Sequence, residues 1–410
     1  MDIDLTLQPG DGRPVTEFER LRSMGPIFRS DSLGGWLVFS YEDVRAVLSA
    51  TSRFTSEGTP ISHAFGREAM LVVDDTTRHH HMRAVWAKQV AARALDERAA
   101  QIERIVRRLL EPVAAAVRDG KSVDLVPVFQ SFTGEVITWL MGLPAERIGD
   151  LLRWNRALSD TPVLDMAPDS PALARHLATR KEVLTFLHAA LTDRTERLSA
   201  GEPPVDLVAS VAAAVGSNGI TPAIALDNLL NLFIGAVDTT VKWLGNIVTV
   251  LHRHPQALAE IRRDPGLLPK AAEEVMRFET AAQLLMRLVK SDGTVLAGRE
   301  LEAGERIYVL PGAANRDPAV FDEPDRFDIH RRPVPHLGFG SGLHHCLGAN
   351  IARKEVTTFV RALLEMIPDA RLVEVDYGVS WALWGPVRLL IGEDRSLSSV
   401  ASRQAAAGPR

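Results

Sequence analysis

The only cysteine of this 410-residue chain, Cys346, lies in a glycine-rich stretch. It follows Phe339-Gly340-Ser341-Gly342-Leu343-His344-His345 and precedes Leu347-Gly348. The apolar run that begins at Ala349 is typical of a helix, so we expect the sulfur in a tight turn just before a helix N-terminus. The helix dipole and the backbone N–H groups there would stabilise a thiolate. A thiolate on such a loop, with room for a flat partner, is suited to ligate haem iron.

Two other interpretations of Cys346 start from the same residues. A lone cysteine is most often a buried, unreactive side chain. A zinc site is the second alternative, since His344 and His345 adjoin Cys346 and three more histidines stand at 79–81. Adjacent residues rarely point at one metal ion, and zinc ligands are normally separated by other residues. The haem interpretation is therefore preferred.

The stretch Phe-Gly-x-Gly-x-His-x-Cys-x-Gly resembles the haem-binding loop of the cytochrome P450 family, the haem-thiolate monooxygenases, at all ten positions from Phe339 to Gly348. The resemblance implies haem b (iron protoporphyrin IX) as the cofactor and Cys346 as the axial ligand of its iron. It also implies that Phe339, Gly340, His344 and Gly348 form part of the cofactor-binding loop.

A second cluster of cationic residues stands at His79 and Arg83. These residues are four apart, so on a helix they share a face and can grip a dianion. The matching His-x-x-x-Arg of the family holds haem propionates, although the proline that usually precedes it is Thr77 here. By the same resemblance Arg287 and His336 are further propionate-binding residues. Which of the three histidines at 79–81 faces inward is left open by the sequence.

A long apolar helix is expected from Thr221 to about His252, with Thr221 as its N-cap. Polar residues interrupt it at Gly235-Ala236-Val237-Asp238-Thr239-Thr240, and buried polar groups are costly unless they are satisfied or used. A threonine can also bond to the carbonyl one turn earlier and bend the helix. This stretch resembles the oxygen-binding groove of the family, with Ala236 where glycine is usual. The resemblance implies that Asp238 and Thr239 deliver protons.

A structural network is expected around Glu274 and Arg277, which are three apart on a helix and able to pair. The family buries such a pair and adds an arginine from a later loop. Arg326, in Pro324-Asp325-Arg326-Phe327, is the residue that matches by resemblance.

The fold class is expected to be mainly α with small β-sheets, which is the cytochrome P450 fold, with the haem between the central helix and the cysteine loop. One domain should span residues 15–392, between a flexible N-terminus (1–14) and a disordered tail (393–410). A helix from Leu95 to Arg118 is expected to kink at Pro112. Residues 57–71, expected as a loop, and the 160–180 region would cover the substrate pocket. Residues 229–237, 284–289 and 380–384 would line it and are mostly apolar.

The composition narrows the function classes. Net charge is −5 with mixed signs, so no nucleic-acid-binding face is indicated. One cysteine fits a reducing cytosol. The N-terminus does not resemble a signal peptide, and no long uncharged apolar run predicts a membrane span. The chain resembles the soluble, bacterial and cytoplasmic members of the family.

The function that the resemblance implies is monooxygenation, in which one atom of O2 enters a small hydrophobic substrate and the other becomes water. Hydroxylation and oxidative O-demethylation both remain open. Electrons would come from NAD(P)H through ferredoxin reductase and ferredoxin. A basic patch near Cys346, made by Arg83, Lys88, Arg353 and Lys354, would attract an acidic ferredoxin. A peroxide-using enzyme of the same fold and a non-catalytic haem protein are the alternatives.

Overall fold

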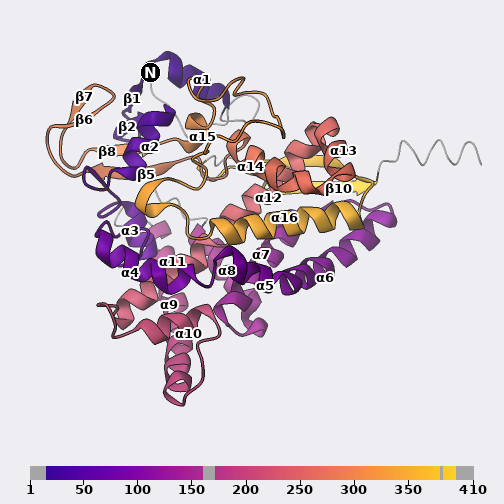
Figure 1. Cartoon of the computed structure of the whole chain (residues 1–410), viewed down its shortest axis with the longest axis horizontal. Helices are drawn as coiled ribbons and strands as arrows, with labels where there is room; N and C mark the ends of the chain where they lie inside the picture. The colour runs from indigo at the N-terminus through magenta and orange to yellow at the C-terminus, as the bar shows by residue number, and fades with distance from the viewer. Residues whose placement is uncertain (1–14, 160–170, 379–381, 394–410) are drawn as a thin grey trace, which may run out of the picture.

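The computed structural model describes residues 15–159, 171–378 and 382–393. The expected termini, 1–14 and 394–410, lie outside these ranges, as do parts of the 160–180 and 380–384 segments. The chain is mainly helical with small sheets, as expected (Figure 1). Its α-helices are α1 (Val15–Ser23), α2 (Tyr41–Ser49), α3 (Pro60–Phe65), α4 (Thr76–Ala87), α5 (Ala92–Glu97), α6 (Ala99–Arg118), α7 (Val126–Met141), α8 (Ile148–Ser159), α9 (Pro171–Ser199), α10 (Leu207–Ala214), α11 (Pro222–Gly235), α12 (Asp238–Arg253), α13 (Pro255–Arg263), α14 (Leu268–Phe278), α15 (Pro311–Ala314) and α16 (Ala349–Met366).

The strands form three small sheets among the described residues. One has the order β1-β2-β8-β5-β3, in which only β2 and β8 run parallel; the second has the order β4-β10-β9; the third is the β6-β7 hairpin. The strand bounds are β1 (Ile27–Ser30), β2 (Gly35–Val38), β3 (Phe54–Thr55), β4 (Val123–Asp124), β5 (Leu285–Val289), β6 (Thr294–Leu296), β7 (Arg299–Leu301), β8 (Arg306–Val309), β9 (Ala370–Asp376) and β10 (Arg388–Glu393).

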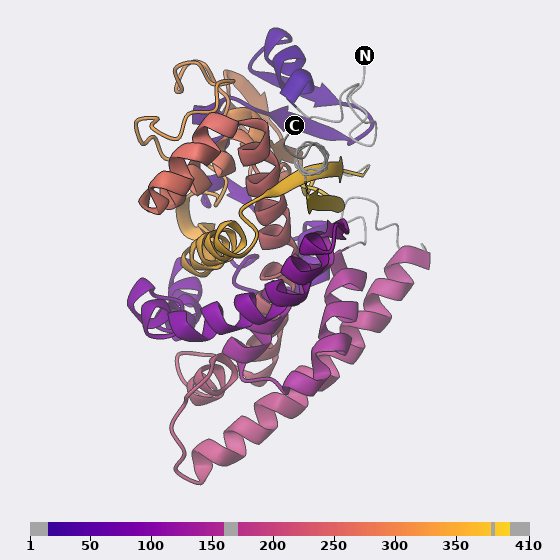
Figure 2. The ribbon, with the colours of Figure 1, turned by 90° about the vertical axis from the view of Figure 1, so that its right-hand side faces the viewer.

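The core is divided between a helical part and a sheet part. The large apolar cluster gathers buried residues of α6, α7, α11, α12, α14 and α16, while two smaller clusters lie around the first sheet. In Figure 1 the sheet part lies at the upper left, and α16 crosses the middle of the molecule. Helix α9 runs along one side of the molecule (Figure 2). This arrangement places the loop before α16 between the two parts.

The central helix is divided into α11 and α12 rather than continuous. Thr221 caps α11 as expected, with its side chain accepting from the N–H of Ile224. Helical geometry is lost at Val237 (φ −98°, ψ −71°). The Oγ1 of Thr239 donates to the carbonyl of Gly235 at 3.1 Å, which is the back-bonding that bends helices.

Three local expectations were wrong. The 57–71 segment contains α3, because Pro60 at the first helical position is already set for helical φ. The helix expected over 95–118 is interrupted at Arg98. Pro112 lies inside α6, and the kink expected there stays a prediction. Glu393, expected in the tail, pairs with Ala370 in the second sheet.

The α11–α12 pair, Pro222–Arg253, is long and apolar enough to cross a membrane by length and composition alone. Of its most apolar window, 56 % is buried inside the protein. These helices therefore pack as part of the core, because their buried apolar residues belong to the large cluster that they share with the other helices.

Candidate functional site

The Cys346 loop closes on itself just before α16. The N–H of Cys346 donates to the carbonyl of Phe339 at 2.9 Å, and Gly340 and Gly342 have φ of +72° and +70°. A Cβ on Gly342 would lie 2.6 Å from the Cα of Ser49, so a larger residue would push the loop off α2. The loop therefore needs glycine at these positions to hold the sulfur before the helix, as expected.

The sulfur lies in a partly enclosed place. Cys346 is accessible to solvent, yet protein atoms surround it closely enough for burial to raise the pKa of its thiol. Both observations hold because Cys346 lines a cavity of about 170 Å³ together with Arg83, His345 and Arg353. A thiol with a raised pKa becomes a thiolate when a metal ion coordinates it.

The expected stabilisation of the thiolate by backbone groups is present but does not dominate. Burial is the largest influence on the pKa of Cys346 and raises it. The N–H groups of Gly348 and Ala349, with the charges of Arg83 and Arg353, act in the opposite direction. The helix start therefore only moderates the pKa of this thiol.

His79 is the histidine of the 79–81 run that faces inward. Its side chain is buried, His80 is exposed, and His81 is intermediate. The rings of His79 and His344 meet edge to face, with centroids 5.3 Å apart. Burial, followed by nearby positive groups that include His344 and Arg83, lowers the pKa of His79 to about 4, so the ring is neutral at pH 7 and still has one N–H to donate.

Arg287 is the other buried cation of this region. Burial lowers the pKa of its guanidinium to about 10, and the charge of Asp74 opposes this effect. Its Nη1 donates to the carbonyl of Met286 at 2.8 Å, and no carboxylate of the described residues forms an ion pair with it. A buried guanidinium normally has an anionic partner, so this one is suited to bind an anionic ligand.

Arg83 and His336 do not contact the His79–His344 pair directly. The Nη1 of Arg83 donates to the carbonyl of His345 at 2.8 Å, which places Arg83 beside the cysteine loop. His336 lies 3.2 Å from an Oε2 of Glu273, which also binds Arg353 with two hydrogen bonds of 2.8 Å. His336 therefore has a protein carboxylate as a partner already.

The interrupted central helix presents an opening at the expected groove. Gly235 is exposed although its helix is otherwise largely buried, and a Cβ built on it would meet nothing within 4 Å. Ala236 packs partly against the apolar core, and Asp238 and Thr239 are partly accessible. The open side of this helix can therefore accept a ligand atom beside Gly235.

The residues present fit a haem with two propionates. The Nδ1 atoms of both His79 and His344 are buried without a hydrogen-bond partner among the described residues. Such atoms normally have one, so a polar ligand group belongs there. With the guanidinium of Arg287, which has no carboxylate partner among the described residues, and the thiol of Cys346, they supply donors for propionate oxygens and a soft ligand for iron.

The structural network contains Arg331 in place of Arg326. Glu274 and Arg277 form a buried ion pair at 2.8 Å, as expected. The Nε of Arg331 donates to Oε1 of Glu274 at 3.1 Å, while the side chain of Arg326 pairs with Glu323 at the surface. Arg326 contributes only its carbonyl, which accepts from both Arg277 and Arg331. The expectation for Arg326 was wrong because the turn after it brings a residue five positions later back to the pair.

Two residues of the site were missed altogether, Asp74 and Glu273. Asp74 is buried and its Oδ1 lies 3.0 Å from Nε2 of His344. Glu273 joins α14 to His336 and Arg353. Asp74 adjoins the expected His79 helix, but nothing near it in the sequence indicates a partner 270 residues away, His344. Glu273 precedes Glu274, but nothing near it indicates its partner His336, 63 residues away.

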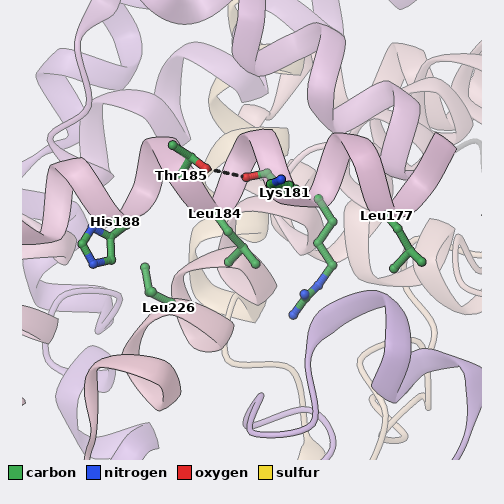
Figure 3. Close-up of a pocket in the computed structure, with 7 residues that line it drawn as sticks. Leu177, Lys181, Leu184, Thr185, His188 and Leu226 are labelled. Carbon is green, nitrogen blue, oxygen red and sulfur yellow. Dashed lines mark hydrogen bonds between the residues drawn. The ribbon is translucent and has the colours of Figure 1, made fainter. Parts of the chain in front are cut away.

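A separate groove of about 510 Å³ lies between α9 and α11 (Figure 3). Two of its lining residues, Leu177 and Arg180, belong to the 160–180 region that was expected to cover the substrate pocket. The others lie outside the expected site; they are Lys181, Leu184, Thr185, His188 and Leu226. Within the described ranges, no group of three or more His, Cys, Asp and Glu side chains is arranged to hold a metal ion. The zinc alternative therefore gains no support.

Comparison with known proteins gives a consistent result. The sequence model of the family described as Cytochrome P450 matches residues 10–265 and 266–366. The cytochrome P450 monooxygenase PikC of Streptomyces venezuelae is 30 % identical over 405 residues, covering 96 % of this chain and 92 % of PikC. The mycinamicin IV hydroxylase/epoxidase of Micromonospora griseorubida is 30 % identical over 367 residues, covering 86 % and 88 %. The solved P450BioI, in complex with an acyl carrier protein ligated to hexadec-9Z-enoic acid, has a TM-score of 0.83 and 27 % identity, covering 93 % of this chain and 98 % of that one.

Proposed function

Because this chain belongs to the cytochrome P450 family, a family of haem-thiolate monooxygenases, we propose that it inserts one atom of O2 into a small hydrophobic substrate by hydroxylation or oxidative O-demethylation. The observation that carries this proposal is Cys346, accessible in its glycine-built loop, together with two buried groups: Nδ1 of His79, which has no hydrogen-bond partner among the described residues, and the guanidinium of Arg287, which forms no ion pair there. Haem b bound through a thiolate supplies the oxygen activation. The names of PikC and of the mycinamicin IV enzyme support the reaction class.

The binding residues have two roles in this proposal. Cys346 ligates the iron, and its loop residues Phe339, Gly340 and Gly348 hold the sulfur in place. The N–H donors of His79 and His344 and the guanidinium of Arg287 bind propionate oxygens. Nδ1 of each histidine is buried without a partner among the described residues, and the Arg287 guanidinium is buried without an ion pair there. Both observations support this role, since a desolvated donor gains most from a charged acceptor.

Arg83 and His336 remain proposed propionate-binding residues, although each has a protein partner. Arg83 holds the carbonyl of His345 and lies against the cysteine loop. His336 is oriented by Glu273, which is compatible with a second hydrogen bond from the other ring nitrogen. The other nitrogen, Nδ1, already accepts from the N–H of Gly338 at 3.2 Å, so His336 is the weaker candidate of the two.

Asp238 and Thr239 are proposed to deliver protons to the reacting oxygen. They are adjacent on α12, so their side chains point about 100° apart. Thr239 lies one turn after the opening at Gly235, where its Oγ1 is held by the Gly235 carbonyl at 3.1 Å. Its oxygen can still accept from a water and hold it beside this opening, while the Asp238 carboxylate takes protons from the solvent side.

Two electrons are proposed to come from NAD(P)H through ferredoxin reductase and ferredoxin, in the cytoplasm. The cavity behind Cys346, lined by Arg83 and Arg353, supports this route because an acidic donor would be attracted there. For the substrate, the apolar residues of α11 that precede Gly235 support a hydrophobic molecule.

The test is the absorption spectrum of the reduced, haem-loaded protein with carbon monoxide. We expect the red-shifted Soret band of thiolate ligation, and Cys346→His should lose it. Ser341→Ala is a matched control in the same loop, because its hydroxyl lies 2.9 Å from that of Ser49 and has no bond to the sulfur. A wild-type spectrum typical of histidine ligation would refute the assignment.

A further inference from the structure

Asp74 is a buried acid among groups that are suited to bind anions, namely His79, His344 and Arg287. It lies just before α4, and its N–H donates to Oε1 of Glu57 at 3.3 Å. One carboxylate oxygen, Oδ1, is 3.0 Å from Nε2 of His344. The other, Oδ2, is buried without a hydrogen-bond partner among the described residues, with Nζ of Lys290 at 3.9 Å. A buried carboxylate is costly unless it serves a purpose.

The contact with His344 restricts what this imidazole can do. A carboxylate accepts hydrogen bonds, so Nε2 of His344 carries the hydrogen of the 3.0 Å contact. The ring of His79, 5.3 Å away and nearly perpendicular, packs against the same imidazole. Held from both sides, His344 keeps one orientation, and its remaining nitrogen Nδ1 is the buried atom that lacks a partner.

We propose that Asp74 is a positioning residue, which holds His344 with Nδ1 directed at the place of a haem propionate. The proposal rests on the haem-binding function proposed above and adds a residue outside the cysteine loop and outside the cationic set. A hydrogen-bonded acceptor behind an imidazole fixes its orientation, and when a propionate carboxylate accepts from Nδ1 the ring carries a hydrogen on each nitrogen. A competing view predicts the opposite effect of Asp74 on haem binding. In that view its carboxylate, which acts on Arg287, would repel the propionates and weaken haem binding.

The two views predict opposite signs for one measurement, the rate at which haem leaves the loaded protein for excess apomyoglobin. Asp74→Ala removes the acceptor, and we expect haem loss to become about three- to tenfold faster, as for one oriented hydrogen bond. Asp74→Asn keeps an oxygen in the same place and should stay within about twofold of wild type. If Asp74→Ala does not fold, Asp74→Ser, whose side chain is too short to reach His344, replaces it.

A double variant shows whether Asp74 acts through His344. In a His344→Ala background, Asp74→Ala should have no further effect on haem loss, because the positioned ring is already absent. The carbon monoxide spectrum of each variant should keep the thiolate band, since none of these changes touches Cys346.

The outcomes separate this proposal from the proposed function. Slower or unchanged haem loss in Asp74→Ala overturns the positioning role, as does an equal effect in the His344→Ala background. Equal acceleration by Asn and Ala overturns it too, because charge and not position would then matter. If the wild type takes up no haem, both this role and the proposed function fail; if it shows the thiolate band while Asp74→Ala behaves like wild type, only the role fails.

Discussion

Thr239 and Asp238 stand side by side at the start of α12, where the central helix resumes after its break. The Thr239 hydroxyl already bonds to the Gly235 carbonyl at 3.1 Å, so its position is defined before any ligand arrives. A hydroxyl oxygen that is held in this way can accept from a water and place that water's proton beside the reacting oxygen, and a carboxylate next to it can supply the proton. At the scale of single residues, this pair is the part of the proposed mechanism most open to a direct test.

Thr239→Ala is expected to keep haem and substrate binding but to lower the product formed per NAD(P)H consumed, because protons would be placed poorly and reducing equivalents would be lost as peroxide. Asp238→Asn should slow turnover more than it lowers this ratio, because the proton supply is interrupted further back. A loss of roughly 100- to 10,000-fold in productive rate is typical when a general acid–base group is removed.

Thr240→Ser is the matched control for this pair, because it changes the neighbouring buried threonine and keeps its hydroxyl. Its coupling should equal that of wild type. A Thr239→Ala variant with unchanged rate and coupling would show that another group supplies the protons.

At the scale of elements, Glu274 and Arg277 of α14 are joined to the loop that leads to Cys346, because Arg277 donates to the carbonyls of Pro324 and Arg326 and Glu274 accepts from Arg331. Arg331, whose side chain is 14 % exposed, donates to Glu274 and to the carbonyls of Glu323 and Arg326. Removing it takes away four hydrogen bonds, although Glu274 and the Arg326 carbonyl keep their bonds from Arg277. Arg331→Ala should therefore lower the free energy of unfolding by about 1–3 kcal/mol.

Arg326→Ala offers the matched comparison, since the Arg326 side chain is 62 % exposed and pairs only with Glu323. Its effect should be under about 0.5 kcal/mol. Urea unfolding of the two haem-loaded variants measures both losses in the free energy of unfolding. A larger loss in Arg326→Ala than in Arg331→Ala would show that the Arg326 side chain belongs to the network after all.

Glu273 ties α14 to His336 and to Arg353 of α16, and it gives this junction a pH dependence. Burial alone would raise the pKa of Glu273, but the hydrogen bonds from His336 and Arg353 outweigh it and lower the pKa to about 2. A carboxyl with a lowered folded pKa stabilises the protein above its ordinary pKa of 4.5, and this contribution is lost as the pH falls from there towards about 2.

We expect the stability difference between wild type and Glu273→Gln to shrink by about 1 kcal/mol over this pH window, a small value because the side chain is partly exposed and solvent screens it. Glu365→Gln is the control, since Glu365 pairs with Arg107 at the surface. A difference that does not change with pH would contradict the role of Glu273.

At the scale of the whole molecule, the face behind Cys346 is where a separate electron donor would dock. Arg83 and Arg353 line its cavity, and Lys88 is exposed beside it on the chain. The positive charge there is less than the sequence suggested, because Arg353 pairs with Glu273 and Lys354 with Asp96. We therefore place the expected attraction mainly on Arg83 and Lys88.

The rate of reduction by an acidic ferredoxin should fall as the ionic strength rises, and Lys88→Glu should lower both the rate and its salt dependence. Lys121→Glu, a charge reversal at an exposed lysine beyond α6, should leave both unchanged. Stopped-flow reduction at several salt concentrations measures this. A rate that is flat or rising with salt would count against electrostatic docking.

The sequence by itself determined the features that depend on neighbours a few residues away. The turn around Cys346, the cap at Thr221 and the bend at Thr239 follow from glycine conformations and from side-chain bonds within four residues. For the same reason the family resemblance, which rests on such short stretches, identified the fold class correctly.

Tertiary structure alone decided which side chains meet across the chain. It selected His79 from three consecutive histidines, replaced Arg326 by Arg331 beside Glu274, and brought Asp74 to His344 from 270 positions away. Each of these contacts depends on how helices and loops pack around a common core, because packing sets the direction and depth of a side chain. No pattern of residue types along the chain carries that information, since equivalent histidines, arginines and acids differ only in what the fold places opposite them.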